Sequence, residues 1–386
     1  MPATGILIQP VDQPIICKPY DEPNDHYVYD RETGEASRAG FRRPAGYHYK
    51  SDRVGGAQLR LLDEERDDLP LVNLLREDVR RWREADYRGA SNVTRDLLQH
   101  WSRPDLSRRL FFCQREAVET IIYLAELRVP GRSSRTGFRN FALSDEDLAR
   151  LLNGQPASFA RPGSDYAQTL IDTPFDASLI PLRRFGCKMA TGSGKTVVMA
   201  MLIAWAFCNR ARNPRSDEFP NAVLVCCPNL TINERLQVLR PERADNYYEA
   251  FDLVPVRYRP LLQFGRVLVT NWHQFAPESE HKEGDKTHAV VNKGPETPGD
   301  FAGRILGDLA RRMPIMVLND EGHHCWRPAA SNSTFGCAIA CASVSARTPK
   351  QSSPTERSGS AYGEMARLRA SLASSSHALG VRQRSC

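Results

Sequence analysis

Eight consecutive residues combine glycines, a lysine and hydroxyl groups in the order Met189-Ala-Thr-Gly-Ser-Gly-Lys-Thr196. Glycines let successive backbone N–H groups turn toward one centre, a lysine reaches the β- and γ-phosphates of a nucleotide, and a hydroxyl binds Mg²⁺. A Gly-Ser turn with a chance lysine is the alternative. We expect a phosphate-binding loop, with Thr196 also a Mg²⁺ ligand. The candidate nucleotide contacts are Thr191, Gly192, Ser193, Gly194, Lys195 and Thr196.

A pair of acidic residues, Asp320 and Glu321, directly follows the apolar run Ile315-Met-Val-Leu-Asn319. At the end of a buried strand, an Asp can hold Mg²⁺ through water while an adjacent Glu orients or deprotonates the attacking water. Such pairs are common on their own. Downstream of a phosphate loop, they predict with Lys195 and Thr196 a complete site for phosphate and metal.

His323 follows this acidic pair in the run His323-His324-Cys325. His and Cys are common metal ligands, but three adjacent residues cannot easily bind one ion. We therefore assign His323 to coupling between nucleotide and nucleic acid.

Gln114 stands near the entrance of an amphipathic segment, Leu110 to Leu127, that predicts a helix. An amide both donates and accepts, so it can read N6 and N7 of adenine together. A lone Gln before a helix is usually a surface residue. Its place upstream of the phosphate loop makes it a candidate adenine contact.

Alternating elements must position these residues. Val197 to Phe207 is apolar on every face and predicts a buried helix whose N-terminus points at the phosphates. Short apolar strands are expected at residues 222–227, 266–270 and 315–319, separated by helices. That alternation indicates an α/β fold, a parallel sheet covered by helices, with functional residues at the carboxyl ends of its strands.

The chain divides by composition into four parts. Residues 1–60 predict an extended arm held on the body by aromatic side chains, with disorder as the alternative. Residues 61–105 predict surface helices over Leu71–Trp82 and Val93–Trp101. The ATPase domain is expected over 106–330, and 331–386 is a Ser-rich, Ala-rich and basic stretch that predicts a disordered tail.

Composition excludes several classes of protein. The 386 residues are 41% hydrophobic, which is enough for a core, and the ten cysteines form no C-x-x-C pair that would indicate a zinc ribbon. The net charge of +6 gives no evidence for a DNA-binding groove, because Ser331 to Cys386 alone holds seven Arg or Lys against two Glu. The first 18 residues predict neither a signal peptide nor a membrane span, so we expect a cytoplasmic protein without membrane contact.

Several of these stretches together resemble a known family. Met189–Thr196 and Asp320-Glu-Gly-His323 are similar to the Walker A and D-E-x-H boxes of superfamily 2 helicases of the DEAD/DEAH-box kind. Phe111-Phe-Cys-Gln-Arg-Glu resembles their adenine-sensing Gln motif, and Met189 stands where many phosphate loops have Gly. With Cys227-Pro-Asn-Leu-Thr231 and Thr270-Asn-Trp-His273, the pattern is similar to the restriction (Res) subunit of type III restriction enzymes.

The resemblance implies a RecA-like fold and an ATP-dependent DNA helicase or translocase using Mg²⁺. Gln114 would read adenine, Lys195 and Thr196 would bind phosphate and Mg²⁺, Asp320 would hold the metal, and Glu321 would activate water. Double-stranded DNA is the implied partner, and a DNA-methyltransferase subunit is a further one that the family allows. Backbone contacts to nucleic acid would come from Pro228, Asn229, Thr231, Thr270 and Asn271, whose alternative role is to close strand ends.

Features of that family are missing after about Pro328. We find no Ser/Thr-Ala-Thr coupling box, no motif with arginine fingers and no clustered acidic residues of a nuclease domain. We therefore expect a chain cut off from its family after the D-E-x-H box, most simply by a frameshift, with a native basic tail that binds DNA as the alternative. Two other functions stay open: a non-catalytic nucleotide- or DNA-binding fragment, and a P-loop ATPase that remodels protein.

Overall fold

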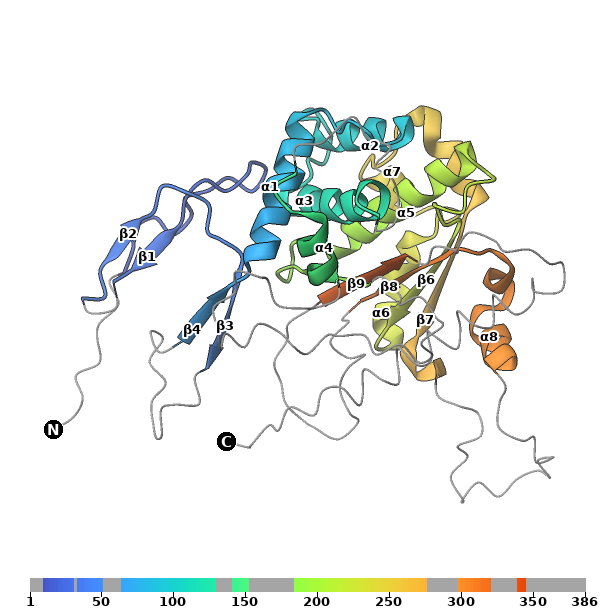
Figure 1. Cartoon of the computed structure of the whole chain (residues 1–386). Helices are drawn as coiled ribbons and strands as arrows, with labels where there is room; N and C mark the ends of the chain where they lie inside the picture. The colour runs from blue at the N-terminus through green and yellow to red at the C-terminus, as the bar shows by residue number, and fades with distance from the viewer. Residues whose placement is uncertain are drawn as a thin grey trace, which may run out of the picture.

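A five-stranded sheet lies at the centre of the chain (Figure 1). The computed structural model describes residues 10–30, 33–50, 64–129, 141–152, 184–275, 298–320 and 339–344. The strands follow in the order β5 (Arg184–Lys188), β9 (Ile339–Val344), β8 (Ile315–Asn319), β6 (Ala222–Cys227) and β7 (Arg266–Asn271). The strands that the sequence predicts between residues 222 and 319 are all present.

The expected parallel sheet is correct for three neighbouring strands and wrong for a fourth. β6 pairs in parallel with both β7 and β8. β9 lies antiparallel between β8 and β5, so the sheet is mixed. β9 also comes from the stretch 331–386 that we expected to be a disordered tail, and the rest of that stretch lies outside the described residues. Because β5 and β8 both oppose β9, these two strands run in the same direction.

Both faces of the sheet are covered, which follows from the all-apolar sequence of β6. Side chains alternate between the faces of a strand. Val223, Val225 and Cys227 join the core around α5 (Lys195–Arg212), and the other three β6 residues join a second core with Phe301. Phe301 belongs to α8 (Pro298–Leu306), which continues into a 3₁₀ helix, Gly307–Arg311.

The predicted buried helix is α5, the longest helix in the described part of the chain. Every residue from Val197 to Asn209 is buried, because α2, α3, α7 and a 3₁₀ helix all pack around α5. Its covering elements are α2 (Asn92–Ser102), α3 (Phe112–Ile122), α7 (Tyr247–Ala250) and the 3₁₀ helix Val256–Phe264.

Helices predicted in the first half of the chain are present. They are α1 (Pro70–Glu84) and α2, and the segment 110–127 forms α3 followed by a π-helical turn, Tyr123–Leu127. The short helix α4 (Asp145–Leu152) begins after Ser144, whose hydroxyl accepts a hydrogen bond from the Asp147 backbone N–H at 3.0 Å. α6 (Leu230–Leu236) follows β6 and leads into a 3₁₀ turn, Gln237–Leu239. No described helix is long and apolar enough to cross a membrane.

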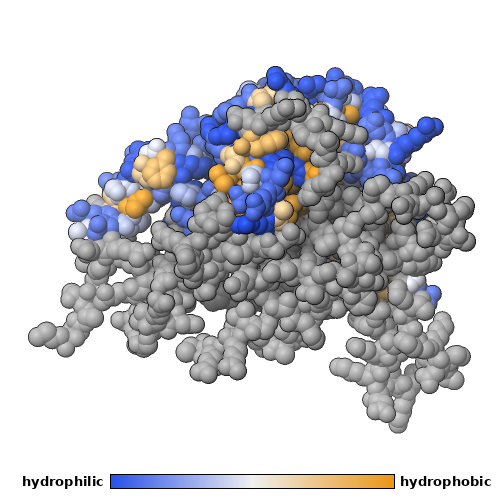
Figure 2. All heavy atoms as spheres, viewed as in Figure 1, coloured by the Kyte–Doolittle hydropathy of each residue, from blue (hydrophilic) through white to orange (hydrophobic). Residues whose placement is uncertain are grey.

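The N-terminal segment forms two hairpins and contacts the helices. β1 (Tyr27–Tyr29) pairs with β2 (Ala36–Arg38), and β3 (Gly46–Lys50) pairs with β4 (Glu64–Asp68). The Tyr20 ring lies 5.6 Å from that of Phe111, and the Phe112 N–H donates to the Pro19 carbonyl at 2.8 Å. Exposed Ile15, Val28 and Phe41 belong to this segment, and Figure 2 shows hydrophobic residues at this end of the described surface.

Candidate nucleotide-binding site

The predicted phosphate loop connects β5 to α5. Gly192 and Gly194 have φ angles of +79° and +84°, a region that glycine enters without steric cost. Gly194 caps α5, and its carbonyl accepts hydrogen bonds from the Val197 N–H at 2.9 Å and from the Val198 N–H at 3.2 Å. The Ser193 hydroxyl donates to the Ala190 carbonyl at 2.6 Å and tightens the turn. The loop is therefore a glycine-shaped turn that ends on a helix N-terminus.

Gln114 lies against this loop although 79 positions separate it from Ser193. Its Nε2 donates to the Ser193 carbonyl at 2.9 Å, and its Oε1 accepts from the Phe111 N–H at 2.9 Å. Only 5% of Gln114 is exposed. A Cβ atom on Gly194 would lie 2.0 Å from the Gln114 Nε2, so the amide requires glycine at that position.

The structure thus brings Gln114 and the loop together. Each end of the Gln114 amide already has one partner, one on the backbone before α3 and one on the loop. Its remaining N–H and the second lone pair of Oε1 are the groups with which it could reach adenine, and adenine reading stays a prediction.

Lys195 and Thr196 form the first turn of α5. Both side chains are partly exposed, and Thr191 and Gly192 are exposed, whereas Val197 is buried. The first N–H groups of an α-helix have no intrahelical partner and lie at the positive end of its dipole. An anion in front of this turn would meet those N–H groups together with the Lys195 ammonium.

The other candidates follow the carboxyl ends of the neighbouring strands. The Asp320 N–H donates to the Cys226 carbonyl at 2.9 Å, which continues the β6–β8 ladder by one residue and fixes the start of the Asp320 segment. Since β5, β6, β7 and β8 run the same way, the phosphate loop, Asn271 and Asp320 leave the sheet at one edge. That edge is where ligands bind in open α/β sheets.

Asp320 lies beside the carboxyl end of β6, where its N–H is bonded to the Cys226 carbonyl. Burial raises the pKa of the Cys227 thiol, and the negative charge of Asp320 raises that pKa further. Asp320 itself is partly exposed.

Two of the five predicted backbone contacts to nucleic acid, Asn229 and Thr270, make hydrogen bonds within the fold. The Asn229 side chain caps α6 by accepting from the Ile232 N–H at 2.9 Å. Thr270 is only 3% exposed, and its hydroxyl donates to Gln274 Oε1 at 2.5 Å. Asn271 is 8% exposed, while Thr231 is exposed and Pro228 partly so. Closing strand and helix ends accounts for Asn229 and Thr270.

Two candidates cannot be placed. Glu321 and His323 lie outside the described residues. Within the described ranges no three His, Cys, Asp or Glu side chains gather as a metal cluster. A nucleotide-bound Mg²⁺ does not need such a cluster, because one or two protein oxygens and the substrate phosphates suffice. The Thr196 hydroxyl and the Asp320 carboxylate supply oxygens of that kind.

The sequence interpretation missed the contact that ties the N-terminal segment to α3. Arg42 makes two parallel hydrogen bonds to the Glu116 carboxylate, both at 2.6 Å, two residues beyond Gln114. The run Phe41-Arg-Arg-Pro was visible in the sequence, but its partner lies 74 positions away. Charge alone could not identify that partner.

Comparison with known proteins adds no relative to this geometry. We compared the chain with protein-family models, curated proteins and solved structures, and none of them matches it.

Proposed function

We propose that the chain binds Mg²⁺-ATP at residues 189–196 and hydrolyses it, as a RecA-like ATPase domain of a superfamily 2 DNA helicase or translocase of the type III restriction kind. One observation carries the proposal. Two glycines with positive φ end on the N-terminus of a buried helix, and the Gln114 amide is hydrogen bonded to the same turn. A chance Gly-Ser turn would not require that combination.

The roles of the residues follow from their positions. Backbone N–H groups of the loop and of the first turn of α5 would bind the β- and γ-phosphates, and the Lys195 ammonium would neutralise their charge. Lys195 begins the helix, so its backbone is fixed by the packing of α5 while its side chain stays partly exposed. Gln114 would hold the loop in shape and contact the adenine edge.

The metal and water roles belong to the same proposal. Thr196 and Asp320 would hold Mg²⁺, which supplies charge stabilisation of the transferring phosphoryl group. Glu321 would orient the attacking water or accept its proton, and His323 would couple the site to DNA. Duplex DNA would lie along the sheet edge near Thr231 and Asn271. We also propose that the protein acts in the cytoplasm.

Hydrolysis of Mg²⁺-ATP with and without duplex DNA tests this function. We expect turnover that DNA stimulates and that Lys195→Ala abolishes. Lys188→Ala serves as the matched control, because Lys188 is an exposed lysine at the end of β5, seven residues before Lys195. Loss of turnover in both variants would point to misfolding, so each is also checked by circular dichroism.

Two other outcomes select the other functions. Lys195-dependent nucleotide binding without turnover would identify a non-catalytic nucleotide-binding protein. Turnover that depends on Lys195 but not on DNA would favour a P-loop ATPase that acts on protein.

A further inference from the structure

A second concave site lies away from the phosphate loop, between the segment 42–44 and the first half of α1. It is a shallow, open hollow of about 780 Å³. Its charged lining consists of four arginines and three carboxylates, namely Arg42, Arg43, Arg76 and Arg80 with Glu22, Asp68 and Glu77. We propose that this pocket binds a phosphate group or a similar oxyanion through Arg43 and Arg76.

Two of the four arginines are already paired. Arg42 donates to Glu116 through both terminal nitrogens at 2.6 Å and to Glu22 at 2.9 Å. Arg80 donates to Glu77 at 2.7 Å and to Glu84 at 3.2 Å. Glu22 also accepts from Arg83 at 3.2 Å, and Glu77 accepts from Arg81 at 2.9 Å. A further bond to Arg43 or Arg76 would therefore compete with existing bonds.

Arg76 is the surplus positive charge of the pocket. Its side chain is partly buried, and no ion pair or hydrogen bond reaches it among the described residues. Burial lowers its pKa, and the positive charge of Arg42 lowers that pKa further, against weaker attraction from Glu116 and Glu22. An added anion between the two guanidinium groups would offset their repulsion, as the Glu116 and Glu22 carboxylates already do in part.

Arg43 adds a second cation that is open to solvent. It is exposed, and within the described part of the chain it makes no ion pair or hydrogen bond. An anion between Arg43 and Arg76 would therefore form new charge-assisted hydrogen bonds without breaking existing ones.

The backbone that carries Arg42 and Arg43 is fixed on α1. Asn73 Oδ1 accepts from the Ala45 N–H at 2.6 Å, and Asn73 Nδ2 donates to the Ala45 carbonyl at 3.2 Å. These two bonds hold the segment against the first turn of α1, only three residues before Arg76. The spacing of the arginines is thus set before any ligand arrives, which lowers the entropic cost of binding.

The chemistry of the pocket favours an oxyanion. A guanidinium presents paired N–H donors whose geometry matches phosphate or carboxylate oxygens. The first turn of α1 also lines the pocket through Pro70, Asn73 and Leu74, so the positive end of its dipole adds to the field. The phosphate could belong to a nucleic-acid backbone or to a small phosphorylated molecule, and the experiment separates the two.

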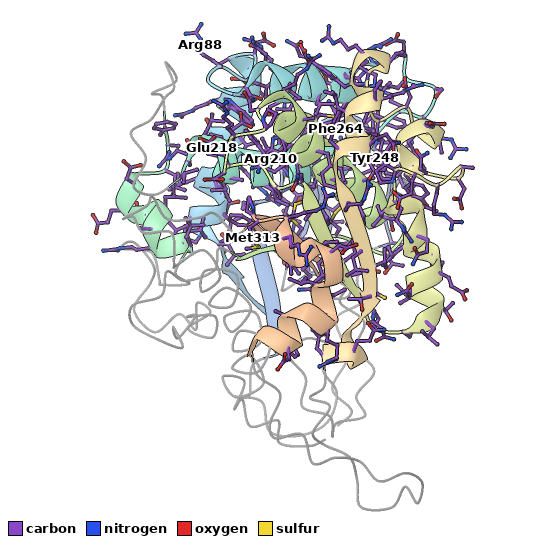
Figure 3. The ribbon with its side chains drawn as sticks, turned by 90° about the vertical axis from the view of Figure 1, so that its right-hand side faces the viewer. Arg88, Arg210, Glu218, Tyr248, Phe264 and Met313 are labelled. Atoms are coloured by element: carbon purple, nitrogen blue, oxygen red, sulfur yellow. The ribbon has the colours of Figure 1, made fainter. Side chains whose placement is uncertain are left out.

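Titration calorimetry with inorganic pyrophosphate tests the pocket in the full-length Lys195→Ala chain. The Lys195→Ala substitution is used so that pyrophosphate binding at the phosphate loop does not obscure binding at the pocket. The result then does not depend on the proposed ATPase function. We expect Arg76→Gln to weaken pyrophosphate binding about tenfold or more, with a smaller loss for Arg43→Gln. Arg88→Gln is the matched control, because Arg88 is exposed and points away from the body (Figure 3).

Stability separates a binding role from a structural one. Without ligand, Arg76→Gln should leave the melting temperature unchanged or raise it, because it removes a repulsive charge. Added pyrophosphate should then raise the melting temperature of the Lys195→Ala parent but not of the Arg76→Gln chain. A structural arginine would instead lower the melting temperature in phosphate-free buffer, and that result contradicts the proposal.

A 20-base-pair duplex in the same titration identifies the source of the phosphate. Arg76→Gln would identify a nucleic-acid backbone as the ligand if it weakens duplex binding and reduces the slope of log K against log salt concentration by about one. If only pyrophosphate binding falls, the ligand is a small phosphorylated molecule. Pyrophosphate binding that is absent, or unchanged by both Arg76→Gln and Arg43→Gln, overturns the proposal.

Discussion

Polar side chains of one neighbouring segment, α3 with its π-helical turn, bond to α5 at two places that differ in exposure. At the N-terminal end, Gln114 of α3 bonds to the glycine turn, and the first helical turn stays partly exposed. Toward the C-terminal end, Glu126 of the π-helical turn accepts from Trp205 Nε1 at 3.1 Å inside the core. We call the first of these the open end. We call the second the closed end, because its polar groups are bonded to one another in the core, although a hollow of about 790 Å³ lined by Ser91, Glu126 and Arg212 lies beside it.

The closed end is completed by a buried network. Thr94 is fully buried, donates to Glu126 at 2.7 Å, and accepts from Trp205 at 3.1 Å and Asn209 at 3.0 Å. Every polar group there has a protein partner, so the network fixes α5 without serving a ligand. We therefore expect the hydrogen bonds at the open end to govern nucleotide binding, and those at the closed end to govern the stability of the fold.

Gly194→Ala should break the open end most strongly. The added Cβ meets the Gln114 amide at 2.0 Å, and φ is +84°, so strain and overpacking together should cost about 3 kcal/mol of unfolding free energy. We expect nucleotide affinity to fall about 100-fold or more. Denaturant unfolding and fluorescence titration with a labelled ATP analogue measure the two effects.

Gly192→Ala is the matched control for that variant. Its φ is +79°, but a Cβ there meets nothing within 4 Å, so only the backbone cost of about 1 kcal/mol should remain. Replacing Gln114 by Ala together with Gly194→Ala should recover part of the lost stability. Equal losses for the two glycine variants would show that the Gln114 contact does not matter.

Thr94→Val should break the closed end. The valine keeps the shape of threonine but leaves Asn209 and Trp205 each with one hydrogen bond fewer, for an expected cost of about 2 kcal/mol. Nucleotide affinity of the folded protein should not change. A tenfold loss of affinity at a temperature where the variant is folded would mean that the two ends are coupled.

Arg42→Met tests a smaller effect, the link between the N-terminal segment and the Gln114 helix. It removes the two hydrogen bonds to Glu116 while keeping an apolar stem, and we expect a loss of about 1 to 2 kcal/mol. Limited proteolysis should then cut residues 10–50 faster. Arg38→Met, which removes an exposed pair with Asp25, should have little effect on proteolysis within the body.

The smallest expected effect is a pH dependence at the closed end. Burial raises the pKa of Glu126 above its ordinary value, although hydrogen bonds from Ser91, Thr94 and Trp205 oppose that shift. A carboxyl with a raised pKa contributes most below its unfolded pKa, and that contribution is lost as pH rises through the folded value. Wild type should therefore lose stability relative to Glu126→Gln as pH rises from acid toward neutral, and a parallel pair of profiles would contradict this.

Local patterns were enough to predict the loop, the three parallel strands and α5. An all-apolar helix next to a glycine turn is encoded by adjacent residues, as are the strands around Val223 and Val317. The sequence could not predict β9, because Ile339–Val344 lies among serines and alanines and gains its pairing only from β5 and β8.

Contacts between distant positions were also beyond the sequence. Gln114 to Ser193 spans 79 positions, and Thr94 to Asn209 spans 115. The residue types do not reveal these pairs, because an amide or a hydroxyl can form a hydrogen bond with almost any polar group. The sequence therefore predicted Gln114 as a site residue, but it could not predict that Gln114 bonds to the loop.

Equilibrium binding of Mg²⁺-ATP to wild type, Lys195→Ala and Lys188→Ala tests the central claim most directly. We expect saturable binding in wild type and Lys188→Ala, and an affinity at least about 100-fold lower in Lys195→Ala. The reason is that only Lys195 lies at the N-terminus of α5, directly after the glycine turn. Equal affinities of the two folded lysine variants, or no binding in wild type, would contradict a nucleotide site at this loop.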